Sequence, residues 1–218
     1  MVRSVPKIIA LLIATLCLGA SAFANNTVFI DFQGIQNMQP VGTFYMADYG
    51  VSFSSNFLGL TSVFNGGAGD FGATPLGTPA IFINAPTGSP ATGVMNVGPG
   101  FSSGLNFYFT AGFTSAQTET VTIWSGANGS GTVLATITLA NNNGSCGSLA
   151  YCNWTDIGAT FSGTAHSVTF SGPANELGVT DITLGSSVTA IPEPSSIYLL
   201  GTGLVGVSVG RIRRYLGV

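Results

Sequence analysis

Apolar and polar residues alternate in several short runs along the middle of the chain. Between 132 and 140, apolar residues at every second position alternate with Thr136 and Thr138. A neighbouring run at 118–126 alternates in the same way. A period of two is typical of a strand with one buried face. Asn128-Gly129 lies between the two runs, so this part of the sequence predicts a β-hairpin.

Similar runs, separated by glycine, serine and asparagine, recur through most of the chain. We expect strands at 27–32, 50–55, 80–84, 104–113, 118–126, 132–140, 155–161, 166–172 and 178–185. No window offers an apolar face at helical spacing. A succession of strands without intervening helices predicts an all-β domain over residues 25–188, an antiparallel β-sandwich of the jelly-roll kind.

The N-terminal segment has the three parts of a secretory signal peptide in their usual order. Arg3 and Lys7 precede a short apolar run, and Ala22 and Ala24 form a small-x-small cleavage site. A buried N-terminal helix is the alternative, but it explains neither the charges nor the cleavage site. We therefore expect residues 1–24 to be removed on export.

The C-terminal segment also has three parts in a fixed order. They are the triplet Pro192-Glu193-Pro194, a glycine-interrupted apolar run at 197–210, and a basic cluster of Arg211, Arg213 and Arg214. Arginines at one end of an apolar helix favour the cytoplasmic side of a membrane. The run therefore predicts a short transmembrane helix with the domain outside the cell.

This tail resembles the PEP-CTERM sorting signal of Gram-negative bacteria, which is also labelled an ice-binding protein C-terminal domain. The resemblance covers residues 189–214. It implies recognition by exosortase, a membrane enzyme that would cut near the triplet and transfer or release the protein. The protein would then pass through an inner-membrane intermediate to the cell surface or the extracellular space. A plain C-terminal membrane anchor is the alternative.

The domain itself also resembles the sandwich domains found ahead of such tails. The shared segments are IDF at 30–32, YGVSF at 49–53, the hairpin at 121–139 and VTDITLGS at 179–186. These are general β features, so this second resemblance supports the fold more than an activity.

The distribution of charge excludes several classes of partner. Between residues 25 and 190 there is no Lys or Arg, whereas seven Asp and Glu residues occur there. Nucleic-acid binding depends on cationic side chains that neutralise phosphates. We therefore expect no nucleic-acid partner and no cofactor.

A serine-hydrolase pattern occurs at 100–104, where Ser102 is flanked by glycines in the order G-x-S-x-G. Asp156 and His166 follow in the order of an α/β-hydrolase triad. However, the nucleophile of that fold stands on a strand-to-helix turn, and here residue 104 leads into a predicted strand. We interpret the pattern as a chance product of a Gly- and Ser-rich chain and assign no catalytic residue. A secreted glycoside or ester hydrolase with an unrecognised site remains the alternative function.

Cys146 and Cys152 are the only cysteines after the predicted cleavage site. Export permits their oxidation, and zinc would need more ligands than two thiols. The sequence therefore favours a disulfide over free thiols or a metal site.

Asp31 and Asp181 lie in the first and last predicted strands, which often pair in a jelly roll. Carboxylate oxygens suit calcium, but the position two residues after the first aspartate is Gln33 rather than a further acid. Calcium at this pair is the alternative to two solvated or turn-capping acids, and the sequence favours the acids without a metal.

The function that fits these features best is that of a non-catalytic surface or matrix protein associated with exopolysaccharide. Sugars would be bound by exposed aromatic side chains, for which the candidates are Tyr45, Tyr49, Trp124 and Trp154.

Overall fold

The computed structural model describes residues 27–86, 89–112, 118–143 and 146–187. Nine strands run through these residues, and all of their pairings are antiparallel. The strands are β1 Val28–Ile30, β2 Val51–Phe53, β3 Phe57–Leu60, β4 Ala80–Ile83, β5 Pro90–Ala111, β6 Glu119–Trp124, β7 Val133–Leu139, β8 Thr155–Pro173 and β9 Leu177–Leu184. The helical elements are α2, Met46–Tyr49, and the 3-10 turn η1, Val63–Asn65.

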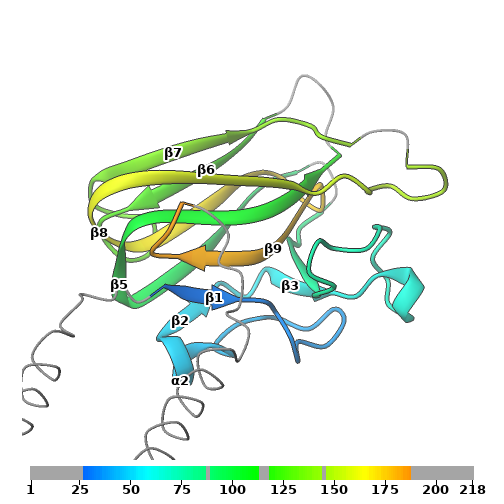
Figure 1. Cartoon of the computed structure of the whole chain (residues 1–218), viewed down its shortest axis with the longest axis horizontal. Coiled ribbons are helices and arrows are strands. Elements are labelled where there is room, and N and C mark those ends of the chain that lie inside the picture. Colours follow the sequence, from blue (N-terminus) through cyan, green and yellow to red (C-terminus); the bar gives the residue numbers. More distant parts are fainter. Residues whose placement is uncertain (1–26, 87–88, 113–117, 144–145, 188–218) are drawn as a thin grey trace, which may run out of the picture.

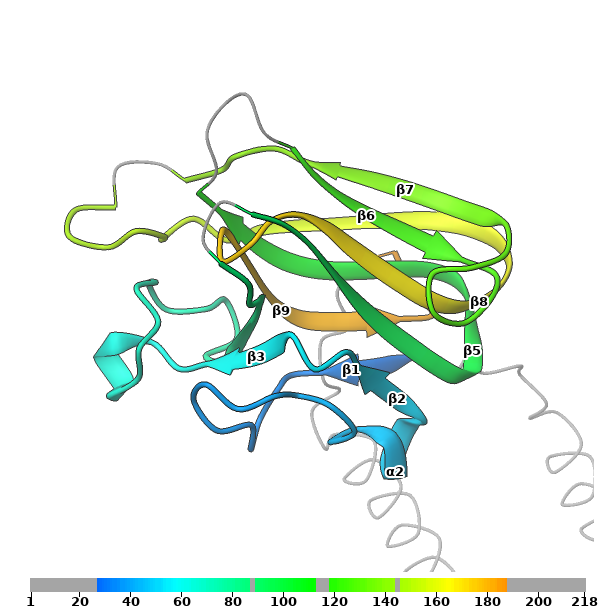
Figure 2. The ribbon, with the colours of Figure 1, turned by 180° about the vertical axis from the view of Figure 1, so that it is seen from behind.

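The strands form two layers, as the views from the two sides show (Figures 1 and 2). The first sheet contains β2, the first half of β5, the second half of β8, β6 and β7, in that order. The second sheet contains the first half of β8, the second half of β5, β9, then β1 and β4 side by side on the same edge of β9, and β3. The predicted antiparallel β-sandwich is confirmed.

β5 and β8 pass from one sheet to the other at the same end of the molecule (Figure 2). Their pairing register shifts between Asn96 and Ser103, where the sequence Gly98-Pro99-Gly100 interrupts β5. Proline cannot donate to the ladder, and Gly100 adopts a φ of 77°, which glycine tolerates best. Gly163, with a φ of 96°, lies at the corresponding bend of β8. These residues allow two long strands to belong to both layers.

Aromatic rings from the two sheets meet in the core. Phe170 of the first sheet packs edge-on against Phe107 of the second, with ring centroids 5.7 Å apart. It makes the same kind of contact with Phe57 at 5.6 Å. A Cβ at Gly93 would lie only 2.3 Å from the Phe57 ring, so the absence of a side chain at this inward position makes room for that ring.

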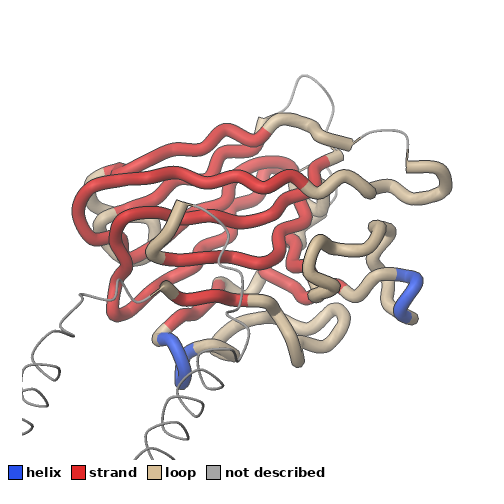
Figure 3. Tube along the Cα trace, viewed as in Figure 1, coloured by secondary structure: helices blue, strands red, loops and turns tan. Residues whose placement is uncertain are grey.

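The strand boundaries differ from the prediction in three places. β3 and the first half of β5 were not predicted, because Gly59, Gly93 and Pro90 interrupt their alternation. The predicted strands at 155–161 and 166–172 are the two halves of β8. Tubes coloured by secondary structure show that strand dominates and that the long loops gather at one end (Figure 3).

The signal segment 1–24, the Pro192-Glu193-Pro194 triplet, the apolar run and the arginine cluster lie outside the described residues. Among the residues that are described, no helix has the length and apolar character needed to cross a membrane.

Candidate functional site

The structure separates the residues of the hydrolase pattern. Ser102 is exposed within β5, beside the bulge at the sheet bend, and not on a strand-to-helix turn. Asp156 pairs with Tyr108, six residues further along β5, which corresponds to about 20 Å at 3.3 Å per residue. His166 lies near the bend, on the same strand as Asp156 but ten residues away. The three side chains do not form a triad.

The four aromatic residues proposed to bind sugar do not form one exposed row. The prediction is wrong for Tyr45, which is only 5% exposed because its ring packs against Phe32 and Tyr49. Tyr49 is exposed on α2, at the opposite end of the molecule from the long loops. Trp124 donates its Nε1–H to Thr169 Oγ1 at 2.9 Å. Of the four, Trp154 has the surroundings expected of a ligand site.

Trp154 lines a cavity of about 380 Å³ on the outer face of the second sheet. Its floor comes from β3, β4, β9 and the end of β5, and the loops at 61–79 and 142–154 form its walls. We call it the Trp154 cavity; its lining is Met38, Leu60, Ala68, Asp70, Phe71, Ala80, Phe82, Asn84, Thr110, Tyr151, Trp154, Asn175, Leu177 and Gly178. Its volume and its mainly apolar, aromatic lining are typical of small-molecule sites, which span about 300–1,000 Å³.

Two glycines in the strands and at their ends make room for the aromatic walls. A Cβ at Gly178 would lie 2.9 Å from Thr110 Cγ2 and 3.4 Å from the Trp154 ring. A Cβ at Gly112 would lie 2.5 Å from the Tyr151 ring. The Trp154 ring also packs edge-on against Phe71 at 5.7 Å. The bare backbone of the floor therefore allows two large rings to rest directly on the sheet.

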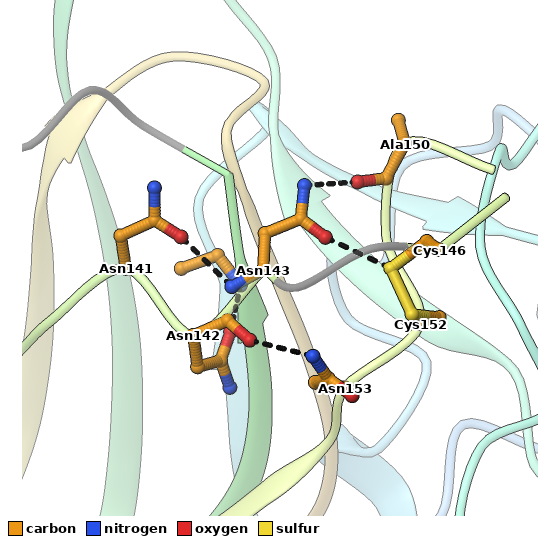
Figure 4. Close-up of a disulfide and its surroundings, with 8 residues drawn as sticks. Asn141, Asn142, Asn143, Cys146, Ala150, Cys152 and Asn153 are labelled. Atoms are coloured by element: carbon orange, nitrogen blue, oxygen red, sulfur yellow. Dashed lines mark hydrogen bonds between the residues drawn. A yellow bond between two sulfur atoms is a disulfide. The ribbon is translucent and has the colours of Figure 1, made fainter.

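A disulfide closes the loop that carries Tyr151 into the cavity. The structure contains the expected bond between Cys146 and Cys152, with their Cα atoms 5.4 Å apart (Figure 4). Tyr151 itself pairs with the opposite wall, since its N–H donates to Asp70 O and its carbonyl accepts from Gly72 N–H. The loop is thus held both by a covalent bond and by backbone pairing.

The asparagine run before the disulfide fastens this loop to the sheet. Asn142 Oδ1 accepts from Ala111 N–H at 2.8 Å, and its Nδ2 donates to Phe109 O and to Thr155 Oγ1. Asn153 Nδ2 donates to Asn142 O at 3.0 Å (Figure 4). Because Asn153 precedes Trp154 directly, these bonds fix the position of the cavity's main aromatic wall.

Three buried polar atoms of the lining residues have no hydrogen-bond partner within the described part of the chain. They are Thr110 Oγ1, Trp154 Nε1 and Asn175 Oδ1. A buried polar group without a partner costs about 1–3 kcal/mol, so it needs a specific explanation. Together the three offer a donor, an acceptor and a hydroxyl that can be either. All three belong to residues that line one apolar cavity.

Acidic groups lie along one side of the cavity. Tyr151 donates its O–H to Glu176 Oε2 at 3.0 Å. Burial raises the pKa of the Tyr151 phenol, and the Glu176 and Asp70 carboxylates raise it further. The phenol therefore stays protonated and serves as a donor. Asp70 is exposed in the lining, and no cationic side chain accompanies it, because residues 25–190 contain no Lys or Arg.

Two other cavities are lined by more irregular segments. One, of about 320 Å³, lies beside η1 and the loop at 71–79, and the other, of about 500 Å³, lies beside Tyr49 and the bend of β5. Neither is lined by a residue with an unpartnered buried side-chain atom among those described. The Trp154 cavity is therefore the candidate functional site.

The two aspartates considered for calcium do come close together. Ile30 and Ile182 are register partners, which places Asp31 beside Asp181. Asp181 is fully buried at a bulge with a φ of 54°; its Oδ1 accepts from Thr78 Oγ1 at 2.7 Å and its Oδ2 has no partner in the described residues. These residues contain no group of three or more His, Cys, Asp and Glu side chains able to hold a metal ion.

Most of the cavity was not foreseen from the sequence. Trp154 and the cysteine pair were singled out, whereas Thr110, Asn175 and Asp70 were not. No local motif marks these three, because they come from a strand end, a turn and a long loop that only the folded chain brings together. The one sequence signal for the acidic side of the cavity was the absence of any Lys or Arg between residues 25 and 190 that could pair with the acids.

Comparison with known proteins finds only distant structural likenesses. No protein-family model matches the chain, and no curated protein matches it. Among solved structures, the K2 cleaved adhesin domain of Lys-gingipain is 12% identical, with a TM-score of 0.48 over 72% of this chain and 98% of that chain. The K1 cleaved adhesin domain of Lys-gingipain from Porphyromonas gingivalis W83 is 9% identical, with a TM-score of 0.45 over 74% of this chain and 99% of that chain.

A carbohydrate-binding module from Cellvibrio mixtus lichenase 5A, solved in complex with cellotriose, is 14% identical, with a TM-score of 0.35 over 72% of this chain and 95% of that chain. At such identities and TM-scores these likenesses carry no argument about function.

Proposed function

We propose that the protein is an exported, non-catalytic component of the cell surface or extracellular matrix that binds polysaccharide in the Trp154 cavity. The observation that carries the proposal is the set of three unpartnered polar atoms, on Thr110, Trp154 and Asn175, in a cavity walled by aromatic rings. A sugar ring offers an apolar face to an aromatic side chain and hydroxyl groups to donors and acceptors. A sugar therefore complements both the aromatic walls and the polar groups of the cavity.

Export is supported by the signal-peptide pattern of residues 1–24 and by the disulfide between Cys146 and Cys152, since such bonds persist in oxidising compartments. We further propose that exosortase recognises Pro192-Glu193-Pro194 and that the membrane holds the tail only transiently. The inference rests on the resemblance of the tail to a PEP-CTERM signal. The hydrolase alternative gains no support from Ser102, which sits in a strand far from Asp156.

Thr110→Val gives the sharpest test of binding. Valine has nearly the same shape as threonine and lacks the hydroxyl, so it removes an unpartnered polar group without opening a space. In the absence of sugar we expect the thermal midpoint to stay the same or rise. The affinity for sugar should fall about five- to tenfold, as expected for one lost hydrogen bond of about 1–1.5 kcal/mol.

The measurement is affinity electrophoresis of the exported protein in gels that contain exopolysaccharide from the producing bacterium. Thr138→Val, at an exposed position of β7, is the matched control and should bind as wild type does. Trp154→Ala should abolish the retardation. If wild type is not retarded, or if Thr110→Val is retarded as strongly as wild type, the cavity is not the binding site.

A further inference from the structure

The negative charges around the Trp154 cavity restrict the kinds of sugar that it can bind. We propose that it takes sugars that are uncharged or carry a protonated amine, prefers the amine-bearing ones, and rejects sugars that carry a carboxylate. This inference rests on the proposed function and concerns the same cavity. It is carried by the exposed Asp70 carboxylate in the lining and by the lack of any cationic side chain between residues 25 and 190.

Asp70 is placed to contact a ligand. Its backbone carbonyl accepts from Tyr151 N–H at 3.0 Å, which fixes the main chain at the edge of the cavity. Its side chain is exposed and makes no hydrogen bond or ion pair with the described residues. In contrast, the carboxylate of Glu176 already accepts the Tyr151 hydroxyl. Asp70 is therefore the free acceptor, and Glu176 is a neighbouring negative charge.

The cavity offers neutral donors and several acceptors, but no Lys or Arg side chain from residues 25–190. Asn175 Oδ1 lacks a partner, whereas its Nδ2 is used by Ala85 O at 2.6 Å. Trp154 Nε1 is the one buried unpartnered N–H among the lining side chains described, and the exposed side-chain amide of Asn84 is a second neutral donor. A carboxylate on a ligand would thus meet neutral donors only, and two negative charges beside them. An ammonium group would meet acceptors and a carboxylate, which is the pairing that favours charge-assisted hydrogen bonds.

The net negative charge of the whole domain also favours amine-bearing sugars over sugars with a carboxylate. Seven acidic residues and no Lys or Arg between 25 and 190 give a negative field over the surface, and such a field raises the local concentration of cations and lowers that of anions. Physiological salt, in which the Debye length is about 8 Å, screens this long-range attraction of cations. The amine preference should therefore weaken as salt is added, while the contacts made by neutral hydroxyl groups should not.

The test uses single sugars, so that it does not depend on a particular glycosidic linkage. Glucose, galactose and mannose, their 2-amino counterparts and their uronic acids are compared by ligand-observed NMR titration with the exported protein. The assay is run at about pH 6, where an amine with a pKa near that of an α-amino group is protonated. We expect the amine to bind about two- to fivefold more tightly than its neutral parent, in line with one exposed charge pair. The uronic acid should bind more weakly than the parent.

Asp70→Asn and Asp48→Asn form a matched pair, because each removes one negative charge and Asp48 is exposed on α2, away from the cavity. Asp70→Asn should remove most of the amine preference, so that the ratio of the affinities for the amine and for its neutral parent falls towards one. Asp48→Asn should keep the preference. The inference is overturned if uronic acids bind as well as neutral sugars, or if the two variants behave alike. If no sugar binds, or if Thr110→Val binds sugar as tightly as wild type does, the proposed function itself fails.

Discussion

Asp181 of β9 lies beside Asp31, which follows β1 directly, so that two carboxylates meet where the first and last strands pair. Burial raises the pKa of Asp181 to about 6, from an ordinary value near 3.8; the Thr78 hydrogen bond lowers it and the Asp31 charge raises it. The folded state therefore keeps the Asp181 proton at a pH where the unfolded state has released it. From about pH 4 to about pH 6, stability should fall as pH rises, by up to about 3 kcal/mol.

Asp181→Asn should remove this dependence. Asparagine keeps an oxygen for the Thr78 hydroxyl and carries no charge. We expect its thermal midpoint to exceed that of wild type above about pH 6 and, in the presence of EDTA, to fall less than that of wild type between about pH 4 and pH 7. Differential scanning fluorimetry across this range checks it, and a variant less stable than wild type at pH 7 in EDTA would contradict it.

Calcium at Asp31 and Asp181 stays the alternative to two acids without a metal, and the same assay tests it. A cation between the two carboxylates would bind only the folded state, so millimolar calcium would raise the midpoint of wild type. Asp181→Asn would lose that rise. An identical midpoint of wild type in calcium and in EDTA would leave the pair as two acids without a metal.

Glu119 is a second buried carboxyl group, and it predicts a separate pH effect. It is fully buried at the start of β6, neither of its oxygens has a partner among the described residues, and burial raises its pKa to about 8. Stability should fall as pH rises from about 4.5 to 8, with a loss of about 3 kcal/mol already present at pH 7.

Glu119→Gln is nearly isosteric and neutral at every pH. Urea unfolding at about pH 5 and pH 8 should show a flatter pH dependence for this variant than for wild type and a higher free energy of unfolding at pH 8. The exposed Asp48→Asn serves as the control and should track wild type. An unchanged pH dependence in Glu119→Gln would show that Glu119 is already charged in the folded state.

The sequence predicted the sandwich because its period-two pattern needs only local information. The alternation from Val121 through Leu139 is the β6–β7 hairpin, with Val121 opposite Ile137. The features that the sequence did not predict depend on contacts between segments that are distant along the chain. Gly93 interrupts an apolar face because the Phe57 ring of the other sheet fills its place, and Thr110 becomes a cavity residue only because Trp154 rests on Gly178.

The disulfide should matter more for sugar binding than for folding. Cys146 and Cys152 enclose a short loop, so replacing both with serine should cost only about 2 kcal/mol of stability. The loop carries Tyr151 into the Trp154 cavity, and its release should lower the affinity for sugar about tenfold or more. The double variant is compared with wild type by urea unfolding and by affinity electrophoresis. Full affinity in a destabilised double variant would mean that the backbone pairing of Tyr151 holds the wall by itself.

The tail is predicted to be a processing signal rather than a permanent anchor. Glu193 stands between two prolines, which hold the backbone extended, as a peptide read in the cleft of a membrane enzyme requires. The apolar run at 197–210 is short and rich in glycine, which suits temporary retention. The arginines follow the run, so they would stay in the cytoplasm. Glu193→Ala should therefore leave export through the N-terminal signal unchanged and block only the later step.

In a host that carries the exosortase, a fractionation blot should find wild type without its tail at the surface or in the medium. Glu193→Ala should accumulate in the inner membrane as a longer form. Ser102→Ala is the control and should mature as wild type does, since Ser102 lies in β5 and takes no part in sorting. A wild type that keeps its full tail, or a Glu193→Ala form that matures normally, would replace sorting with a plain membrane anchor, because an anchor needs the apolar run and the arginines but not the glutamate.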